Sequence, residues 1–376
     1  MQNEFPNAND VCYLNTGSEG LLPLRALRAL QEVAVMKQKP QVLGDSQYFE
    51  MPERCRSLVA QMIHCAAEDI ALIPSTSYGM SMIAHSLQLN SGEEVVIVEK
   101  DFPSNNFAWE PLRERGIKIR TVPFLADADQ TGRVLESLTP PARVLSLSVV
   151  HFFTGFRYDL KLISEVCRQN NILLIVDAIQ AAGTIEINLQ ETHVDALCAA
   201  AHKWQLSPSG TGFLYVNPDL RTRLTSPVSG WMHNKNAGRF SETDMFTYEP
   251  ASNTRRYELG TAPIILFAAY EQSLKVLLES HIPYIEEHNI KLAEKLKAFF
   301  RELGWKQPAT PIPSPFCSVL PPEQFNTADL LRSLAENEVF VAVRANHLRM
   351  TPHLYNTDQH IDRFCEVMKS VIMKKC

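Results

Sequence analysis

The amino-acid sequence predicts an α/β protein with a mostly parallel sheet that helices cover on both faces. Continuous apolar runs such as Val144 to Val150 and Ile172 to Val176 have the length and composition of fully buried strands. Segments with helical spacing alternate with these runs, which is the pattern of a parallel sheet with crossover helices. The chain has 376 residues, of which 45% are hydrophobic and 21% charged, so it can bury a large core.

The first two thirds of the chain carry this alternating pattern. The predicted strands are Asp69 to Ile73, Glu94 to Glu99, Lys118 to Pro123, Val144 to Val150, Ile172 to Val176, Ala196 to Ala200 and Phe213 to Val216. The predicted helices are Leu24 to Met36, Pro52 to Cys65, Tyr78 to Leu87, Phe107 to Arg115, Val134 to Ser137 and Leu160 to Asn170. We expect the last strand to lie antiparallel to its neighbour.

The last third of the chain differs in composition. Residues 226 to 263 are rich in Gly, Asn, Arg, Tyr and Thr without clear periodicity, which predicts a long functional loop. The segments that follow are predicted to be helix, helix, strand, helix, strand and helix: Ile264 to Leu277, Tyr284 to Leu303, Phe316 to Val319, Ala328 to Asn337, Val339 to Val343 and Asp358 to Lys374. We therefore predict a large domain of residues 24–263 and a small α+β domain of residues 1–23 and 264–376.

Charge and composition argue against several classes of partner. The net charge of -6 and the pI near 6.0 give no reason to expect nucleic acid as a partner, because a phosphate backbone requires a basic face. No apolar run reaches the roughly 18 residues of a membrane span, and the polar start MQNEFPNAND does not resemble a signal peptide, so we expect a cytoplasmic protein. The eight cysteines form no CxxC pair and have no histidine at zinc-ligand spacing, which predicts reduced thiols and no metal site.

Polar or aromatic residues follow four of the predicted strands. Phe102, His151, Asp177 and the pair His202-Lys203 each come at or just past a strand's carboxyl end. In an open parallel sheet, ligands bind outside this edge. We therefore expect these side chains to face one crevice.

Asp177 and Lys203 suit the two ends of a pyridoxal phosphate ring. A carboxylate at the end of a buried strand is costly unless a cation faces it, and a protonated pyridine nitrogen is such a cation. Lys203 stands among alanines and Trp204, where burial would favour the neutral amine that forms a Schiff base. Taken singly, Asp177 could only cap a turn and Lys203 could be an ordinary solvated lysine.

The sequence also offers a phosphate site and a ring-stacking residue. Ser75-Thr76-Ser77 precedes the predicted helix at Tyr78, and a helix N-terminus presents N–H donors and a positive dipole end to an anion. Simple N-capping would explain the same residues. Phe102 and His151 could stack on a ring and hydrogen-bond one of its substituents, or they could be packing residues.

Together these residues resemble the class V aminotransferase family of pyridoxal-phosphate enzymes. The motifs that carry the resemblance are SerThrSer at 75–77, AspPheProSer at 101–104, AspAlaIleGlnAlaAlaGly at 177–183, HisLysTrp at 202–204, GlyThrAla at 260–262 and ArgMetThrProHisLeuTyrAsnThr at 349–357. The resemblance implies fold type I, with a mostly parallel, seven-stranded type of sheet in the large domain and a smaller α+β C-terminal domain. It also implies pyridoxal 5'-phosphate as the cofactor.

The resemblance implies a role for each matching residue. Lys203 matches the Schiff-base lysine and Asp177 the partner of the pyridine nitrogen. The other cofactor-binding candidates are Phe102 for ring stacking, Gln180 for the phenolic oxygen, His151 beside it, Thr76, Ser77 and His202 for phosphate, and Thr261 contributed by the neighbouring subunit. Phe102 and His151 are also expected to take part in catalysis. Arg344 matches the arginine that binds the substrate carboxylate, with Arg349 as a second candidate and Asn15 as a further substrate contact. The Thr261 match implies a homodimer with shared active sites.

Three departures from the family pattern bear on activity. Ala200 stands where many relatives have a phosphate-binding serine. The segment from Arg344 to Arg349 is short and contains no cysteine, whereas desulfurases carry a longer loop with the cysteine that accepts sulfur. Phe102 also replaces a histidine that acts as an acid or base in those enzymes. A persulfide-forming cysteine desulfurase is therefore not expected.

The predicted function is that of a pyridoxal-phosphate enzyme acting on a small amino acid through an external aldimine. We expect an aminotransferase, with a C–S lyase or an amino-acid epimerase of the same fold as alternatives. A binding protein without catalytic activity is a further alternative, which the retained Lys203 and Asp177 disfavour. A nucleotide-dependent enzyme on a similar sheet would need a glycine fingerprint or a phosphate loop, and the sequence has neither.

Overall fold

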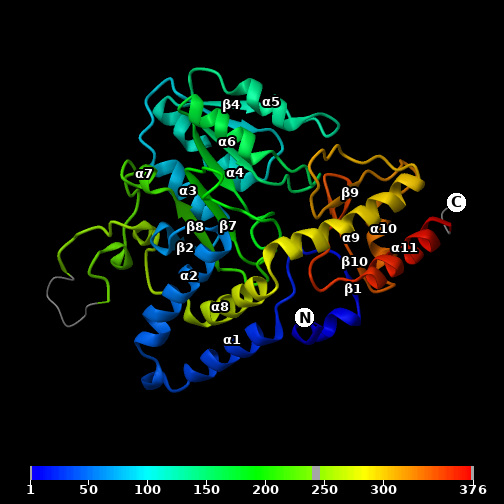
Figure 1. Cartoon of the computed structure of the whole chain (residues 1–376), viewed down its shortest axis with the longest axis horizontal. Coiled ribbons are helices and arrows are strands. Elements are labelled where there is room, and N and C mark those ends of the chain that lie inside the picture. The colour runs from blue at the N-terminus through cyan, green and yellow to red at the C-terminus, as the bar shows by residue number, and fades with distance from the viewer. Residues whose placement is uncertain (1, 239–245, 374–376) are drawn as a thin grey trace.

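The computed structural model describes residues 2–238 and 246–373 and contains a central seven-stranded sheet (Figure 1). The strand order is β2-β8-β7-β6-β5-β3-β4. These strands are β2 (Ile70–Leu72), β3 (Glu94–Val98), β4 (Lys118–Val122), β5 (Ala142–Ser148), β6 (Leu173–Asp177), β7 (Ala196–Ala200) and β8 (Gly212–Val216). Each predicted strand of the large domain is therefore present, with ends that differ by a few residues.

The sheet is mostly parallel, as the continuous apolar runs predicted. Strands β4, β3, β5, β6 and β7 pair in parallel, and β8 pairs antiparallel with both β7 and β2. The antiparallel pairing of β7 with β8 extends from Ala196 opposite Val216 to Ala200 opposite Gly212. Strands β3, β5, β6 and β7 are thus neighbours with their carboxyl ends at one edge.

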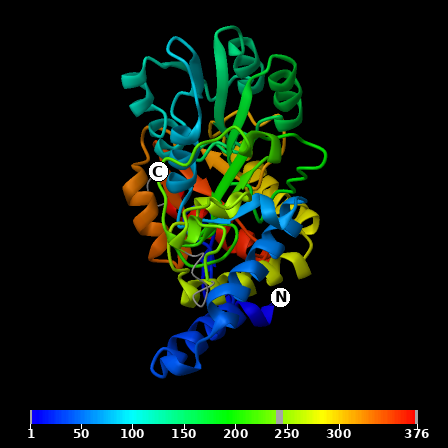
Figure 2. The same ribbon diagram turned by 90° about the vertical axis from the view of Figure 1, so that its left-hand side faces the viewer.

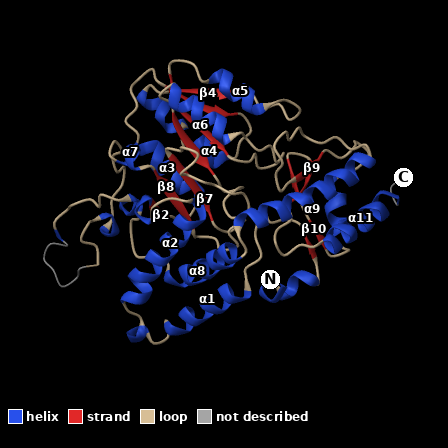
Figure 3. Cartoon of the chain, in the orientation of Figure 1, coloured by secondary structure: helices blue, strands red, loops and turns tan. Residues whose placement is uncertain are grey.

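Helices cover both faces of this sheet (Figures 1 and 3). The helices of this part and of the chain that follows are α1 (Leu24–Met36), α2 (Met51–Ile63), α3 (Thr76–Ser86), α4 (Pro103–Phe107), α5 (Gln130–Ser137), α6 (Leu160–Gln169), α7 (Pro218–Arg221), α8 (Ile264–Glu279) and α9 (Ile282–Glu302). Alternate residues of a strand enter different cores: Leu145 and Leu147 of β5 lie in one hydrophobic cluster and Val144 in the other. Double-sided burial explains why the strands are apolar throughout.

The helix predicted from Phe107 to Arg115 was wrong. The structure has the short α4 and then a 3-10 segment at Glu110–Arg115. Pro111 lies at the start of that segment, and a proline cannot donate the backbone hydrogen bond that would continue an α-helix from α4.

The C-terminal part has two small sheets. Strands β11 (Ala342–Arg344), β12 (His347–Met350) and β9 (Cys317–Val319) form an antiparallel sheet, and β1 (Cys12–Tyr13) pairs in parallel with β10 (Val339–Phe340). The sequence reading did not identify β1 or β12, and it joined β10 and β11 into one strand. Helices α10 (Thr327–Ala335) and α11 (Asp358–Met373) complete this part, while the predicted last helical residue, Lys374, lies outside the described residues.

The N-terminal segment joins this C-terminal part, whereas α8 packs with the large sheet. Cys12 and Leu14 share a hydrophobic cluster with residues of α9, β9, β12 and α11. Phe267 and Leu274 of α8 belong to the cluster beneath the central sheet, and α8 packs against α1 and α2. Helix α9 then runs from the large sheet to the second group of strands (Figure 3), and α1 projects from the body of the molecule (Figure 2). The domain limits at 23/24 and 263/264 remain a prediction.

The state of the cysteines and the absence of a membrane span can be compared with the prediction for the described residues only. The seven described cysteines are free, and Cys376 lies outside the described residues. In residues 2–238 and 246–373, no helix is long and apolar enough to cross a membrane. The cytoplasmic location remains a prediction.

Candidate active site

A cavity of about 300 Å³ opens at the carboxyl edge of the parallel strands. Its lining residues are Gly17, Ser18, Ser75, Thr76, Ser77, Phe102, Ser104, Phe152, Ile179, Gln180, Ala200, His202, Lys203, Arg344 and Arg349. They come from the N-terminal segment, the strand ends of the large sheet and the β11–β12 hairpin. Eight of the predicted site residues therefore lie in this lining: Thr76, Ser77, Phe102, Gln180, His202, Lys203, Arg344 and Arg349.

Asp177 ends β6 and lies buried behind this lining. Its Oδ1 accepts a hydrogen bond from the Ile179 backbone N–H at 2.9 Å, but its buried Oδ2 has no partner among the described residues. Burial raises the pKa of this carboxyl to about 7, and the nearby Asp101 acts in the same direction. A buried acceptor without a donor fits the protonated ring nitrogen of pyridoxal phosphate.

Lys203 follows β7 and is only 8% exposed. Burial lowers its pKa to about 8, and the positive charge of Arg349 adds to this shift. The N-terminal segment closes over it, because the Gly20 N–H donates to the His202 carbonyl at 2.8 Å. A Cβ at Gly20 would lie 2.1 Å from the Lys203 carbonyl oxygen, so this approach requires glycine.

Phe102 and Gln180 line the same cavity as this lysine, but Phe102 is exposed and Gln180 is buried. Phe102 is 37% exposed, and its ring centroid lies 5.4 Å from Lys203 Nζ. Gln180 is buried, and its amide is fixed because Oε1 accepts from Trp204 Nε1 at 2.8 Å and Nε2 donates to the Gly17 carbonyl at 3.1 Å. The second amide hydrogen of Gln180 is left for a ligand oxygen.

The N-terminus of α3 lines the cavity. Ser75 caps the helix by accepting from the Tyr78 N–H at 3.2 Å, so the capping interpretation of this serine is correct. Thr76 Oγ1 accepts from the Ala200 N–H at 2.9 Å, and Ser77 Oγ lies 2.6 Å from Ser104 Oγ. These hydroxyls and the free N–H groups of the first turn suit a phosphate.

His202 also lines this cavity. Burial, with a further contribution from the Lys203 charge, lowers its pKa to about 4. Its imidazole is therefore neutral at pH 7 before an anion is bound.

Two guanidinium groups from the β11–β12 hairpin also line the cavity and form what we call its wall. Arg349, in β12, is 1% exposed; its Nη1 donates to the Phe152 carbonyl at 2.5 Å and its Nη2 to Ser18 Oγ at 2.7 Å. Arg344 lies at the end of β11 and donates to the same Ser18 oxygen at 3.0 Å. Burial, reinforced by the charge of Arg344, lowers the pKa of Arg349 to about 9.

His151 does not line the cavity. Its Nε2 lies 3.0 Å from the Lys100 carbonyl and its Nδ1 3.0 Å from Thr154 Oγ1, so both ring nitrogens have partners within the chain. The ring stacks on Phe124 with a centroid distance of 3.9 Å. Burial lowers the pKa of His151 to about 4, so it is neutral at pH 7. These contacts agree with the packing interpretation, and a cofactor contact by His151 remains a prediction.

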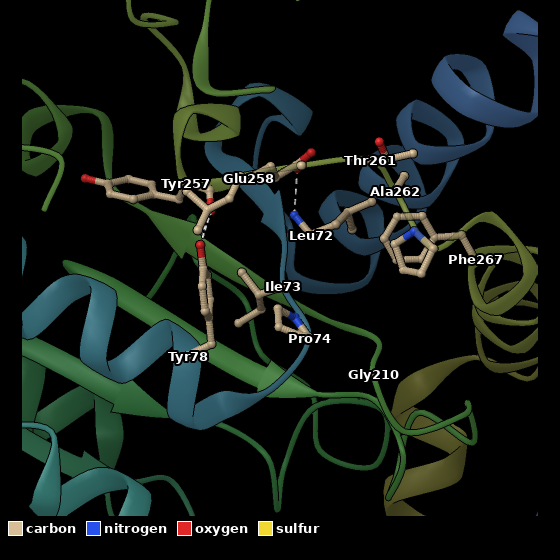
Figure 4. Close-up of a pocket in the computed structure, with 13 residues that line it drawn as sticks. Leu72, Ile73, Pro74, Tyr78, Gly210, Tyr257, Glu258, Thr261, Ala262 and Phe267 are labelled. Carbon is tan, nitrogen blue, oxygen red and sulfur yellow. Dashed lines mark hydrogen bonds between the residues drawn. The ribbon is translucent and has the colours of Figure 1, made fainter. Parts of the chain in front are cut away.

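Thr261 and Asn15 are also outside this lining. Thr261 lines a separate cavity of about 390 Å³ with Tyr78, Tyr257 and Glu258 (Figure 4). In that cavity the Tyr78 hydroxyl donates to the Tyr257 carbonyl at 2.7 Å. Asn15 bridges to Thr351, and its buried Oδ1 has no partner among the described residues. The roles predicted for both residues remain predictions.

Five lining residues were not assigned a role from the sequence: Gly17, Ser18, Ser104, Phe152 and Ile179. The sequence did contain a signal for Ser104, because this residue is the last of the AspPheProSer motif. Ser18 lies in a glycine-containing loop whose position depends on contacts with the C-terminal part, and a sequence-local pattern does not reveal such contacts.

The cavity residues, together with Asp177 behind them, fit pyridoxal phosphate. They provide an unpaired carboxylate oxygen for the ring nitrogen, a lysine with a lowered pKa for the aldehyde, an exposed aromatic ring for stacking and a helix N-terminus for the phosphate.

Known proteins resemble this chain over most of its length. A family model described as aminotransferase class-V matches residues 33–363. An uncharacterized aminotransferase of Bacillus subtilis is 26% identical over 315 residues, covering 83% of this chain and 82% of that protein. Isopenicillin N epimerase of Streptomyces clavuligerus is 26% identical over 384 residues, covering 96% and 95%. The apo structure of a cysteine desulfurase from Thermococcus onnurineus has a TM-score of 0.88 at 19% identity, covering 99% of this chain and 97% of that one, which shows a shared fold.

Proposed function

This chain belongs to the class-V aminotransferase family, and from that premise we propose that it is an aminotransferase acting on a small amino acid. The family's cofactor is pyridoxal 5'-phosphate and the fold is fold type I, as the sequence predicted. The observation that carries the proposal is a cavity lined by Lys203, with its lowered pKa, and by the buried Arg349, with the unpaired carboxylate oxygen of the buried Asp177 behind the lining.

Five residues would hold the cofactor in this proposal. When bound, pyridoxal phosphate supplies an electron sink for the bonds at the substrate α-carbon. Lys203 attaches it, Asp177 keeps its ring nitrogen protonated, and Phe102 stacks on the ring. Gln180 donates its remaining amide hydrogen to the phenolic oxygen, and Ser77 contributes to the phosphate site. The fixed amide of Gln180 supports this orientation, since Trp204 and Gly17 occupy its other positions.

Ser104 would replace the phosphate-binding serine that Ala200 lacks. Its hydroxyl lies 2.6 Å from that of Ser77 at the N-terminus of α3, so an anion there could accept from both. We propose Thr261 as a contribution from a second copy of the chain. Its position in a cavity other than that of Lys203 is compatible with such a shared site.

Arg349 would bind the substrate α-carboxylate. From the sequence, Arg344 was the first candidate for this role and Arg349 the second. We reverse this ranking, because Arg349 is buried and has no acidic partner among the described residues. A planar guanidinium binds a carboxylate through two parallel hydrogen bonds and so fixes the α-carbon near Lys203. Once displaced from the cofactor, the Lys203 amine would move the α-proton.

Among the described lining residues, Lys203 has a pKa lowered to about 8, whereas the pKa of His202 is lowered to about 4, so Lys203 is the better base near neutral pH. One base that moves a proton between two carbons on the same side suits transamination. Epimerisation needs a proton donor on the opposite side as well.

An amino-acid epimerase is the second candidate, because the isopenicillin N epimerase of Streptomyces clavuligerus matches 96% of this chain. We do not expect a persulfide-forming desulfurase. The β11–β12 connection is a tight turn at Ala345 and Asn346, both with positive φ, and no described cysteine lines the cavity.

The test is incubation of the cofactor-loaded protein with a panel of L-amino acids and pyruvate or 2-oxoglutarate as amino acceptor. The aminotransferase proposal predicts a keto acid formed in step with a new amino acid. Racemised substrate without keto acid would favour the epimerase, and sulfide or ammonia without a new amino acid would favour a lyase.

A further inference from the structure

The two arginines of the cavity wall have no acidic partner in the described part of the chain. The guanidinium of Arg349 is buried, and two of its nitrogens donate to the neutral oxygens of Phe152 and Ser18. Its Nε is buried without any partner. A buried charge is costly unless an anion pairs with it, so the anion that this group lacks is expected to be a ligand.

Arg344 repeats this feature at the cavity mouth. It is an exposed residue whose Nη1 donates to the adjoining Val343 carbonyl and whose Nη2 donates to Ser18 Oγ. Neither arginine forms an ion pair within residues 2–238 and 246–373. The acidic Glu19 of the neighbouring segment interacts electrostatically with Lys203. Because both Nη2 atoms are at hydrogen-bond distance from one oxygen, the two guanidinium groups lie side by side.

In the proposed function, the cofactor would occupy the other polar groups of the site. The α3 N-terminus and the neutral His202 would face its phosphate, Asp177 would face its ring nitrogen, and Lys203 would hold its aldehyde. The α-carboxylate of an amino acid then satisfies one guanidinium, since the planar fork accepts one carboxylate in a bidentate manner. The second guanidinium is left without an anion.

We propose that the substrate carries two anionic groups, with its α-carboxylate on the buried Arg349 and a short acidic side chain on Arg344. The inference rests on the proposed function, which it deepens by naming the substrate class. The side chain is short because the two guanidinium groups meet at the same hydroxyl. An amino acid of aspartate or glutamate length, with a carboxylate or another compact anion at its end, has this spacing.

The hairpin geometry supports the assignment of Arg344 to the side chain. Arg344 is the last residue of β11 and lies opposite His347 across the tight turn at Ala345 and Asn346. This turn holds Arg344 at the open side of the cavity, where its side chain is exposed to solvent. Arg349 in β12 is buried. The buried position suits the group common to all amino acids, and the exposed position suits the group that varies.

The test compares acidic ligands with their uncharged amides, which have nearly the same size. Binding of glutarate and of its monoamide to the cofactor-loaded protein is measured by calorimetry, and kcat/KM is measured for L-glutamate against L-glutamine and for L-aspartate against L-asparagine. The variants are Arg344→Gln and, as a matched control, Arg332→Gln, an exposed arginine of α10 outside the cavity.

We expect the wild type to prefer at least one acidic member over its amide by about tenfold or more, since charge-assisted hydrogen bonds are roughly twice as strong as neutral ones. Arg344→Gln should remove this preference while changing the values for the amides by less than about twofold, and Arg332→Gln should leave it intact. Equal binding of acid and amide by the wild type would overturn the inference. So would an Arg344→Gln variant that loses both alike, because Arg344 would then bind the α-carboxylate.

The calorimetric comparison also separates this inference from the proposed function. Failure of the protein to form a chromophore on Lys203 would refute the proposed function. The preference for glutarate over its monoamide is measured on the same sample without turnover, and its presence or absence decides the two-anion inference alone.

Discussion

The floor and the wall of the cavity are built in different ways. The floor uses Asp177, Gln180 and Lys203, which neighbouring parallel strands and their loops bring together within a short stretch of chain. The wall uses Ser18 and Arg349, which are 331 positions apart and meet only through the packing of the two chain ends. These three residues of the proposed cofactor site are thus local in the sequence, whereas the proposed substrate-binding wall depends on long-range contacts. Changes to the floor should abolish chemistry, and changes to the wall should alter substrate choice.

The largest effect is expected for Asp177→Asn. The amide keeps the shape of the side chain but cannot hold the ring nitrogen protonated, so kcat should fall by about 10²-fold to 10³-fold, the scale of a lost electrostatic contact. The measurement is steady-state kinetics, with visible absorbance to verify that the cofactor is retained.

A buried aspartate at the other end of the same sheet provides the control. Asp195 precedes β7 and accepts from the Leu174 N–H at 2.8 Å, far along the strand from the cavity. Asp195→Asn should leave kcat within about twofold of the wild type, because the asparagine side-chain oxygen can still accept from the Leu174 N–H and the residue does not line the cavity. Equal losses in the two variants would show that Asp177 acts through the fold and not on the cofactor.

The next largest effect concerns the wall. Arg349→Gln should raise KM by about 10-fold to 100-fold, the value of hydrogen bonds to a charged group, with a smaller change in kcat. Arg349→Lys should give an intermediate KM, since it keeps the charge but loses the fork. A fall in kcat with unchanged KM would contradict the assignment of Arg349 to substrate binding.

The third effect is a pH dependence at the floor. The pKa of Lys203 is lowered to about 8, so the neutral amine grows about tenfold per pH unit below that value and levels off above it. The rate of cofactor attachment should therefore rise from pH 6 to about pH 8 and then become constant. Stopped-flow absorbance measures this rate, and butylamine in solution corrects for titration of the cofactor itself. A rate that rises up to pH 10 would show an unperturbed lysine.

The smallest effect is expected at the phosphate end. Ser104→Ala removes one neutral hydroxyl, so the Kd of the cofactor should rise about fivefold, which corresponds to about 1 kcal/mol. Ser81→Ala, on the same helix as Ser77 but beside a different cavity, serves as the control. Equal affinity of the Ser104 variant and the wild type would leave Ala200 without the proposed replacement.

The same division between floor and wall explains what the sequence could predict. Apolar runs determine buried parallel strands, and the carboxyl ends of these strands lie at one edge of the sheet, so Asp177, Lys203 and Phe102 could be found without coordinates. The short β12 strand and the partner of Ser18 could not, because their positions depend on the pairing of β1 with β10 and of β11 with β12.

His151 shows a second limit of predicting site residues from their position at the ends of strands. It follows β5 as predicted, yet its ring turns toward Phe124, Lys100 and Thr154 and not into the cavity. Position along a strand gives the location of a backbone but not the rotamer of a side chain. The sequence also could not show which of the two arginines is better placed for the proposed α-carboxylate site. Burial distinguishes Arg344 from Arg349, and residue type does not.

The measurement that tests the central claim most directly is borohydride reduction of the cofactor-loaded protein, followed by mass mapping of its peptides. The account predicts a visible chromophore that reduction converts into a stable adduct on Lys203, and its absence in Lys203→Ala. The exposed Lys161 of α6, changed to alanine, should leave the adduct unaltered. An adduct on another lysine, or no chromophore at all in protein supplied with pyridoxal phosphate, would contradict the account.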